Sequence, residues 1–380
     1  MSQYSQRYWQ YSLVTVLVMV LLQGCSSVGV SAGAAVEVPV AAEGVLPQEA
    51  AVSSLEGVVS GSEESLSADP FEGIYSSFSD EMTLADGGAT DSEKSSPLTF
   101  LAEINGGRDA LTAAIPTWVT GEQFTRFLEP VAFTLHDEAL YILDSGRQAM
   151  FRYNADENII ITIFDFSQYL RGTPAGLVFS DDGYYFISDP KLNRVLKFNA
   201  ENILIAVYED IANLASPGKL YFDNKYNKLY ISDGVYSRIL VASKHGDFLY
   251  ALGGRGTDPG QFISITDFVS TETGIYVIDR IAKEPMQVLN HEGDYLRAYG
   301  SSSLSIPVAI AVDERGYVYV ADNEDDTIRI FVDGVLRWRV GGSGIQQGYF
   351  RKVTQMMVSD DKLYVLDSLN RRIQVFQINN

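Results

Sequence analysis

The feature that most constrains this chain is a short unit that recurs six times between residues 140 and 367. Each copy is an apolar run that ends in aspartate, as in "LYILD" and "LYVLD". The six aspartates are Asp144, Asp189, Asp233, Asp279, Asp322 and Asp367. Their intervals are 45, 44, 46, 43 and 45 residues. A near-constant period of this size indicates a repeat architecture.

One repeat resolves cleanly into four strands. They are "VAIAVD" (308–313), "YVYVAD" (317–322), "TIRIFV" (327–332) and "LRWRVG" (336–341). Their alternation has a period of two, and turns such as Asp-Gly supply the positive φ of tight hairpins. Four antiparallel strands per repeat are typical of a β-propeller blade. The sequence therefore predicts an all-β, six-bladed β-propeller of four-stranded antiparallel blades.

The last repeat lacks a fourth strand, because the chain ends at "IQVFQINN". An open sheet edge favours aggregation, so we expect an N-terminal outer strand to close the last blade. Residues 115–119 resemble the fourth strands of other repeats and are predicted to be that strand. The segment "PLTFLAEI" (97–104) receives no assigned place.

The six aspartates end the second strand of each repeat, where a carboxylate can accept hydrogen bonds from the backbone of the turn. Arginine follows five residues later in three repeats, as Arg194, Arg238 and Arg372. The other three repeats carry Ala149, Glu284 and Thr327 there. We interpret both columns as structural, with each arginine paired to the aspartate of its own or a neighbouring blade. A ligand site is the alternative.

These features resemble the NHL repeat family of six-bladed propellers over residues 112–380. The best matches are "GRGTDPGQF" (254–262) and "GSGIQQGYF" (342–350), together with the turn "LDSLNRRIQVF". Pro130, Pro174, Pro217 and Pro307 open inner strands as the family's proline does, while Ile265 and Val353 depart from it. The resemblance implies the fold and says little about activity.

The N-terminus predicts export. An apolar run over residues 12–22 precedes "LLQGC", which resembles a bacterial lipobox, so residues 1–24 are expected to be a lipoprotein signal peptide and Cys25 to carry lipid. An ordinary secretory signal is the alternative. Ser26 after the cysteine favours the outer membrane, on its periplasmic side, over the inner one.

Residues 25–97 are predicted to form an acidic flexible tether. Residues 98–380 are predicted to form the propeller. From residue 26 to residue 97 there are thirteen acidic side chains and one basic side chain, Lys94. Such a composition buries too little apolar surface to fold alone. The formal net charge of the whole chain is −21, which argues against a nucleic-acid partner.

Catalytic signals are sparse. The column expected to line the central channel is Ala132, Gly176, Lys219, Asp267, Ala309 and Gln355. Lys219 and Asp267 can pair there, but a calcium site needs several converging oxygens. The three histidines, His136, His245 and His291, fall in separate turns. We therefore predict no catalytic residues, no metal and no cofactor.

Binding is the remaining hypothesis. Loops on one propeller face offer Arg255, Phe262, Arg280, Lys283, Tyr349, Phe350 and Arg351, with interblade packing as the alternative for the two phenylalanines. Aromatic and arginine side chains are frequent interaction hot spots. We expect a monomeric, lipid-anchored binding or scaffold protein for an envelope protein or glycan. The alternative is a propeller hydrolase or lyase with a metal in the channel near Asp267.

Overall fold

The structure is a computed structural model, and it describes residues 96–110, 123–209 and 211–379. The predicted signal peptide, Cys25 and the tether up to residue 95 lie outside the described residues. Within the described ranges, no helix combines the length and the hydropathy of a membrane span.

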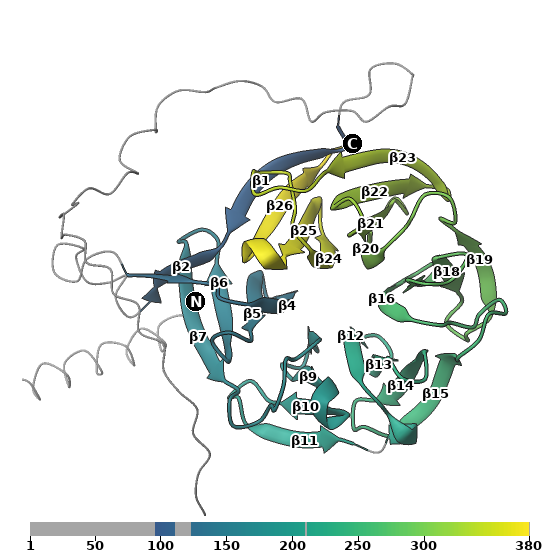
Figure 1. The fold of residues 1–380 in the computed structure, drawn as a ribbon. Coiled ribbons are helices and arrows are strands. Elements are labelled where there is room, and N and C mark those ends of the chain that lie inside the picture. Colours follow the sequence, from purple (N-terminus) through teal and green to yellow (C-terminus); the bar gives the residue numbers. More distant parts are fainter. Residues whose placement is uncertain (1–95, 111–122, 210, 380) are drawn as a thin grey trace, which may run out of the picture. The chain divides into compact units, whose positions relative to one another are not determined.

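Six sheets surround a central axis (Figure 1), so the propeller predicted from the repeat is confirmed. The inner strand of each blade is the first of its repeat. Blade 1 contains β4 (Pro130–His136), β5 (Ala139–Asp144), β6 (Ala149–Asn154) and β7 (Ile159–Asp165). Blade 2 contains β8 (Leu177–Phe179), β9 (Tyr185–Asp189), β10 (Arg194–Phe198) and β11 (Leu204–Tyr208). Blade 3 contains β12 (Pro217–Asp223), β13 (Lys228–Asp233), β14 (Arg238–Ser243) and β15 (Phe248–Gly253).

The second half of the ring repeats this order. Blade 4 contains β16 (Ile265–Thr271), β17 (Gly274–Asp279), β18 (Met286–Leu289) and β19 (Tyr295–Tyr299). Blade 5 contains β20 (Pro307–Val312), β21 (Val318–Asp322), β22 (Thr327–Val332) and β23 (Val335–Gly341), within a residue of the strands predicted from sequence. Blade 6 contains β24 (Val353–Ser359), β25 (Lys362–Asp367) and β26 (Arg372–Ile378). Short 3-10 turns lie at η1 (Pro190–Leu192), η2 (Ile211–Asn213) and η3 (Ser368–Asn370).

An N-terminal strand, β1 (Leu98–Ile104), is the fourth strand of blade 6. It pairs antiparallel with β26, from Leu98 opposite Ile378 to Ile104 opposite Ile373. The assignment of this strand to residues 115–119 is therefore wrong in its segment, and those residues lie outside the described part of the chain. Both segments are short and apolar, so strand propensity alone does not distinguish them.

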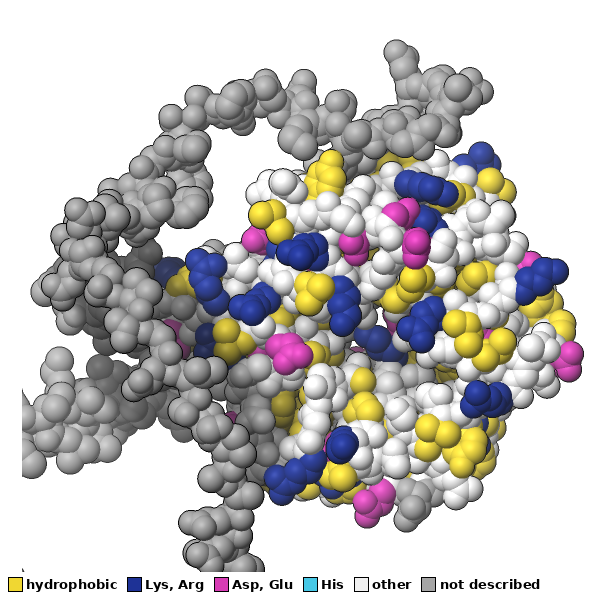
Figure 2. All heavy atoms as spheres, in the orientation of Figure 1, with side chains coloured by type: hydrophobic (Ala, Val, Ile, Leu, Met, Phe, Trp, Pro, Cys, Tyr) yellow, Lys and Arg dark blue, Asp and Glu magenta, His cyan; other side chains and the backbone are white. Residues whose placement is uncertain are grey.

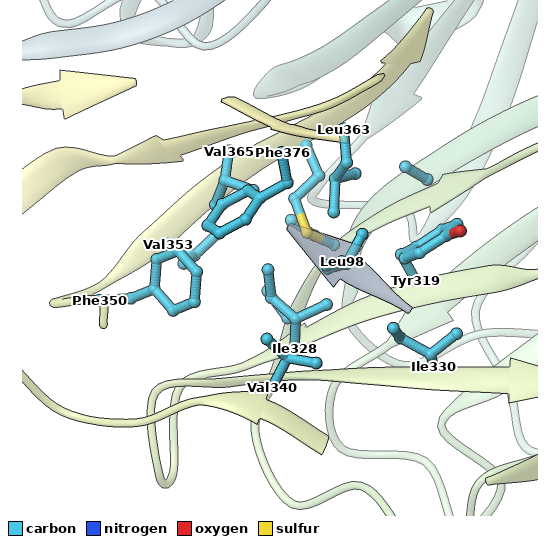
Figure 3. Close-up of a cluster of buried hydrophobic side chains, with 14 of the residues drawn as sticks. Leu98, Tyr319, Ile328, Ile330, Val340, Phe350, Val353, Leu363, Val365 and Phe376 are labelled. Carbon is cyan, nitrogen blue, oxygen red and sulfur yellow. The ribbon is translucent and has the colours of Figure 1, made fainter. Parts of the chain in front are cut away.

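The side chain of Leu98 anchors β1 in the core. It is 1% exposed and belongs to a cluster with Tyr319, Ile330 and Phe376, so it packs between blades 5 and 6 (Figure 3). On the inner side of the ring, the Gln355 amide donates to the Phe133 carbonyl and accepts from its N–H, at 2.8 and 3.1 Å. The inner strands of the first and last blades are thus joined directly by this pair of hydrogen bonds.

After β1 the chain passes to blade 1 and widens it. Strand β2 (Gly106–Asp109) pairs parallel with β7, and β3 (Phe124–Arg126) pairs antiparallel with β2. Gly106 has φ +149°, and a Cβ there would lie 2.0 Å from the carbonyl oxygen of Thr125. Glycine is therefore required where the chain passes between the two blades. The sequence did not predict this extension.

We expect Leu98→Ala to lower the unfolding free energy by about 2 to 4 kcal/mol, because it removes a buried side chain and leaves a cavity. Leu101→Ala is the matched control on the same strand, since Leu101 is 46% exposed, and its effect should stay within about 0.5 kcal/mol. Urea unfolding followed by circular dichroism measures both. Equal effects of the two substitutions would contradict the anchoring role of β1.

Candidate binding face

The loops that enter each blade and the turns between its second and third strands lie at the same end of the propeller. We call this end the loop face. The other end carries the turns between first and second strands and between third and fourth strands, and we call it the turn face.

The repeated aspartates are buried beneath the loop face, and their carboxylates accept hydrogen bonds from its loops and turns. All six are at most 1% exposed. In blade 5, Asp322 accepts hydrogen bonds from the N–H groups of Ser305 and Ile306, at 2.6 and 2.9 Å. Asp144 and Asp279 accept the equivalent pairs in blades 1 and 4. Each of these carboxylates therefore ties the loop that enters a blade to that blade's own turn.

The repeated arginines add a second connection within their own blade. Arg194, Arg238 and Arg372 contact Asp189, Asp233 and Asp367 through Nε at 3.2, 3.1 and 2.8 Å. Their terminal nitrogens donate to loop carbonyls, those of Tyr169, Ala212 and Ile345. The aspartate and arginine columns thus form structural contacts within a blade.

Blade 5 uses a different arginine, which the five-residue spacing did not reveal. Thr327 holds the expected position, but Arg329 makes ion pairs with Asp322 and, at 2.9 Å, with Asp325. Arg329 also donates to the carbonyl of Ser303 in the entering loop. Residues two apart on a strand share a face, so an arginine shifted by two positions reaches the same carboxylate. A sequence pattern that allows arginine either five or seven residues after the aspartate would include Arg329.

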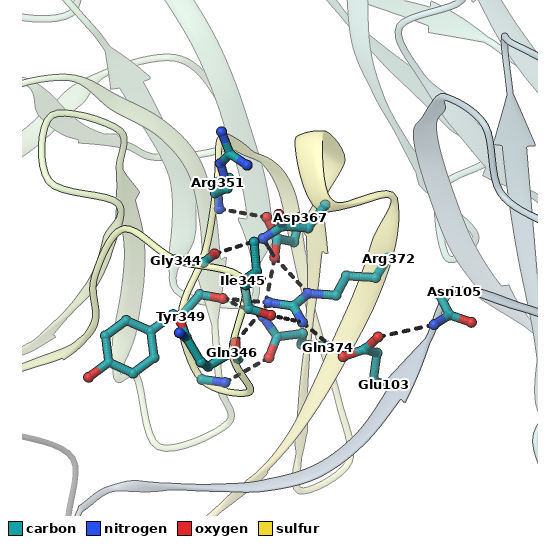
Figure 4. A network of polar contacts seen from close by, with 12 residues as sticks. Glu103, Asn105, Gly344, Ile345, Gln346, Tyr349, Arg351, Asp367, Arg372 and Gln374 are labelled. Atoms are coloured by element: carbon teal, nitrogen blue, oxygen red, sulfur yellow. Dashed lines mark hydrogen bonds and ion pairs between the residues drawn. The ribbon is translucent and has the colours of Figure 1, made fainter. Parts of the chain in front are cut away.

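Blade 6 has the most extensive network (Figure 4). Arg372 donates to Asp367, to Glu103 of β1 at 2.8 Å, and to the carbonyls of Ile345, Gln346 and Tyr349. Burial raises the pKa of Asp367, although its hydrogen bonds and Arg372 oppose that rise. Because Glu103 belongs to β1, the closing strand and the loop face share one polar network.

Aliphatic and aromatic side chains protrude from the loops and turns of this face on all six blades. They range from 37% to 65% exposed. In blade order they are Leu128, Leu192, Val235 and Tyr236, Ile281, Ile306, and finally Ile345 and Leu369. Scattered exposed apolar residues are normal on a protein surface, but this set includes at least one residue from every blade at one end of the propeller.

Charge differs sharply between the two faces. Within the described loops and turns, nine basic side chains stand against seven acidic ones on the loop face. The basic residues are Arg147, Arg171, Lys191, Arg255, Arg280, Lys283, Arg351, Lys352 and Arg371. The described turn-face turns carry three basic and sixteen acidic side chains. Figure 2 views the basic end, where blue and yellow side chains are interspersed.

The predicted binding residues divide by exposure. Arg255, Arg280, Lys283 and Arg351 are exposed on the loop face, and Tyr349 is partly buried. Phe262 and Phe350 are 0% exposed in interblade clusters, which corrects their prediction as contact residues. A Cβ atom added at Gly253 would lie within 2.5 Å of the Phe262 ring, and one added at Gly341 within 2.5 Å of the Phe350 ring. Glycine at these two positions therefore makes room for the rings. Arg351 also borders a depression of about 740 Å³ with Asp326, Ile345, Lys352 and Leu369.

The central channel holds the expected polar residues without a direct ion pair between them. Lys219 Nζ donates to the carbonyl of Thr354 at 2.9 Å. Asp267 accepts from the N–H groups of Phe268 and Ile310, at 2.9 and 3.1 Å. Burial raises the pKa of Asp267 to about 6, an effect that the positive charge of Lys219 opposes. Both carboxylate oxygens therefore already have partners within the inner strands.

The three histidines lie at the turn face, in blades 1, 3 and 4: His136 is the last residue of β4, whereas His245 and His291 lie in turns between third and fourth strands. His136 stacks on Phe179 with ring centroids 4.6 Å apart, and His291 Nε2 is 3.4 Å from Ser270 Oγ. Among the described residues, no three His, Cys, Asp or Glu side chains are grouped to hold a metal ion.

Comparisons with known proteins support the fold. A family model described as a 6-bladed beta-propeller matches residues 209–329. Virginiamycin B lyase from Staphylococcus aureus is similar in structure, with a TM-score of 0.50 and 10% identity over 66% of this chain and 95% of that one. A streptogramin B lyase structure has a TM-score of 0.50 and 11% identity, over 68% and 84%. No curated protein matches the sequence. At these identities the likeness is to the fold alone: this chain contains a six-bladed β-propeller.

We expect Arg372→Ala to lower the unfolding free energy by about 3 to 5 kcal/mol, because it leaves the buried Asp367 carboxylate without its cation. Arg371→Ala is the control, since Arg371 is exposed one residue earlier, and should change stability by less than about 0.5 kcal/mol. Chemical denaturation measures both. An Arg372→Ala protein as stable as the Arg371→Ala protein would remove the structural role assigned to this column.

Proposed function

We propose that this chain is a non-catalytic binding protein whose propeller docks a partner protein on the loop face. One observation carries the proposal: all six blades expose apolar side chains at the end where basic residues outnumber acidic ones, while the opposite end is strongly acidic. A partner with an apolar patch and surrounding carboxylates fits this chemistry. Basic residues would speed and orient its approach, and the aliphatic tips would contribute the buried area.

The hydrogen bonds beneath the loops support a docking role. Aspartate or arginine contacts fix the entering loops of all six blades. A surface that is ordered before binding loses less conformational entropy when a partner docks. Arg280, Lys283 and Ile281 lie together in one turn of blade 4 and combine both kinds of side chain.

The second hypothesis from the sequence, a hydrolase or lyase with a channel metal, has little to support it. Asp267 is the carboxylate that would begin such a site, and its two oxygens accept backbone hydrogen bonds. A calcium or zinc ion needs several further ligands. We therefore place the function at the loop face.

For the N-terminus we propose lipidation at Cys25 and residence in the bacterial cell envelope, on the evidence of the sequence alone. Residues 25–97 would then tether the propeller to the membrane with a root-mean-square reach of roughly 50 Å. Such a tether would let the loop face search for partners near the membrane.

Replacing Ile281 and Leu369 by glutamate should abolish the capture of the partner, because it places charge within the proposed apolar contact. Cross-linking in intact cells identifies the partner, and binding of the two purified proteins then gives the affinity. We expect a loss of at least about 100-fold for the double variant. Ile205→Glu is the control, since Ile205 is 50% exposed on the outer strand β11. Equal affinities of both variants would refute the loop face as the docking site.

Cys25→Ser should abolish incorporation of labelled palmitate and release the protein from the membrane fraction. The reason is that serine cannot form the thioether that carries the lipid. Fractionation with the unaltered chain as control measures both effects. Continued labelling of the serine variant would show that the lipobox resemblance is fortuitous.

A further inference from the structure

A groove of about 1020 Å³ lies between blades 3 and 4 on the turn face. We call it the tyrosine groove, because Tyr221, Tyr226, Tyr230 and Tyr250 of blade 3 line one side. Ser270, Glu272, His291 and Glu292 of blade 4 line the other. The groove lies at the opposite end of the propeller from the loop face, so a ligand held in it would bind independently of the proposed docking there.

Strand register gathers the tyrosines. Tyr221 of β12 is paired with Tyr230 of β13, which is paired with Val241 of β14, which is paired with Tyr250 of β15. Directly paired residues of antiparallel strands lie on the same face of a sheet, so the three rings form a row that faces blade 4. The rings of Tyr221 and Tyr230 meet edge to face, with centroids 5.8 Å apart. Tyr226, in the adjoining turn, is 60% exposed.

Two lysines fix the outer rings. Lys228 Nζ donates to Tyr250 Oη at 3.2 Å and lies 5.6 Å from the ring centroid of Tyr226. Lys225 Nζ lies 5.1 Å from the same ring. The Tyr226 N–H donates to Asp223 Oδ1 at 3.0 Å, which holds the turn. Within the described residues Lys228 makes no ion pair, so its ammonium is held by aromatic groups instead.

Both walls offer hydrogen-bonding groups. Burial raises the pKa of Tyr221 and of Tyr230, so both hydroxyls stay protonated at neutral pH. Across the groove, Ser270 Oγ and His291 Nε2 are 3.4 Å apart, and Glu272 and Glu292 are exposed at the rim. The groove thus combines an exposed aromatic ring with hydroxyl, imidazole, ammonium and carboxylate groups.

This combination suits one class of ligand. A sugar ring has an apolar C–H face that can pack on an aromatic ring, and edge hydroxyls that both donate and accept hydrogen bonds. The acidic turn face repels anionic chains. Ligand sites of comparable size are concave, with aromatic walls and a few polar groups that fix orientation. We propose that the tyrosine groove binds a neutral oligosaccharide, stacked on Tyr226 and hydrogen-bonded by Lys228 and the residues of blade 4.

Calorimetric titration of the full chain with three neutral probes, maltohexaose, cellohexaose and chitohexaose, tests the proposal. We expect at least one to bind with a dissociation constant of about 1 mM or tighter. Hexagalacturonate, an anionic hexasaccharide, should bind at least about tenfold more weakly. Tyr226→Ala should weaken binding of the neutral probe by at least about tenfold, because it removes the stacking surface.

Tyr236→Ala is the matched control, since Tyr236 is a 46% exposed tyrosine on the loop face, and should leave sugar affinity unchanged. Lys228→Met removes the ammonium that contacts the Tyr226 ring and Tyr250 Oη and that would donate to the sugar, so it should also weaken binding. The proposal is overturned if no neutral probe binds at about 10 mM. It is likewise overturned if Tyr226→Ala binds as well as Tyr236→Ala, or if hexagalacturonate or a hexa-alanine peptide binds more tightly than every neutral probe.

Discussion

The pairing of β1 with β26 is the interaction on which the rest of the molecule depends. Without it, blade 6 would present the bare edge of β26, and Leu98 would leave the cluster that joins blades 5 and 6. The same strand brings Glu103 to Arg372, which holds the entering loop through three of its carbonyls. Closure of the ring and order of the loop face are therefore coupled, because one strand contributes to both.

Features of the fold that depend on residues close together in the sequence could be predicted. Features that depend on contacts between residues far apart in the sequence could not. The period and the strand alternation are local, so six blades and the strands of blade 5 could be predicted directly. The closing strand could not, because its choice depends on pairing with residues nearly 280 positions away. Residues 98–104 take that place through the burial of Leu98 and the Glu103–Arg372 contact, neither of which a local pattern reveals. The short, glycine-rich β2 likewise carries too little pattern to predict.

The same reasoning explains the site residues. Arg255, Arg280, Lys283 and Arg351 are exposed where the repeat places them, because turn positions depend on strand positions. Phe262 and Phe350 turned out to be core, since the packing partner of a loop aromatic lies in another strand. The row from Tyr221 to Tyr250 crosses four strands, so only register brings it together. The net charge of the chain does not reveal that acidic side chains concentrate at the turn face, while the loop face carries slightly more basic than acidic ones.

Part of the acidity of the turn face follows from the backbone conformation of its turns. Asp137, Asp333 and Asp360 adopt positive φ in turn-face hairpins, a conformation that aspartate tolerates better than most residues. Turn geometry does not require Glu272, Glu292 or Glu314, so the acidity of this face exceeds what folding demands. The channel, meanwhile, offers little free chemistry, because Lys219 and Asp267 use their polar atoms on neighbouring backbone. Under the proposed function, recognition therefore falls to the rims and to the seams between blades, where a substitution leaves the packing of the inner strands intact.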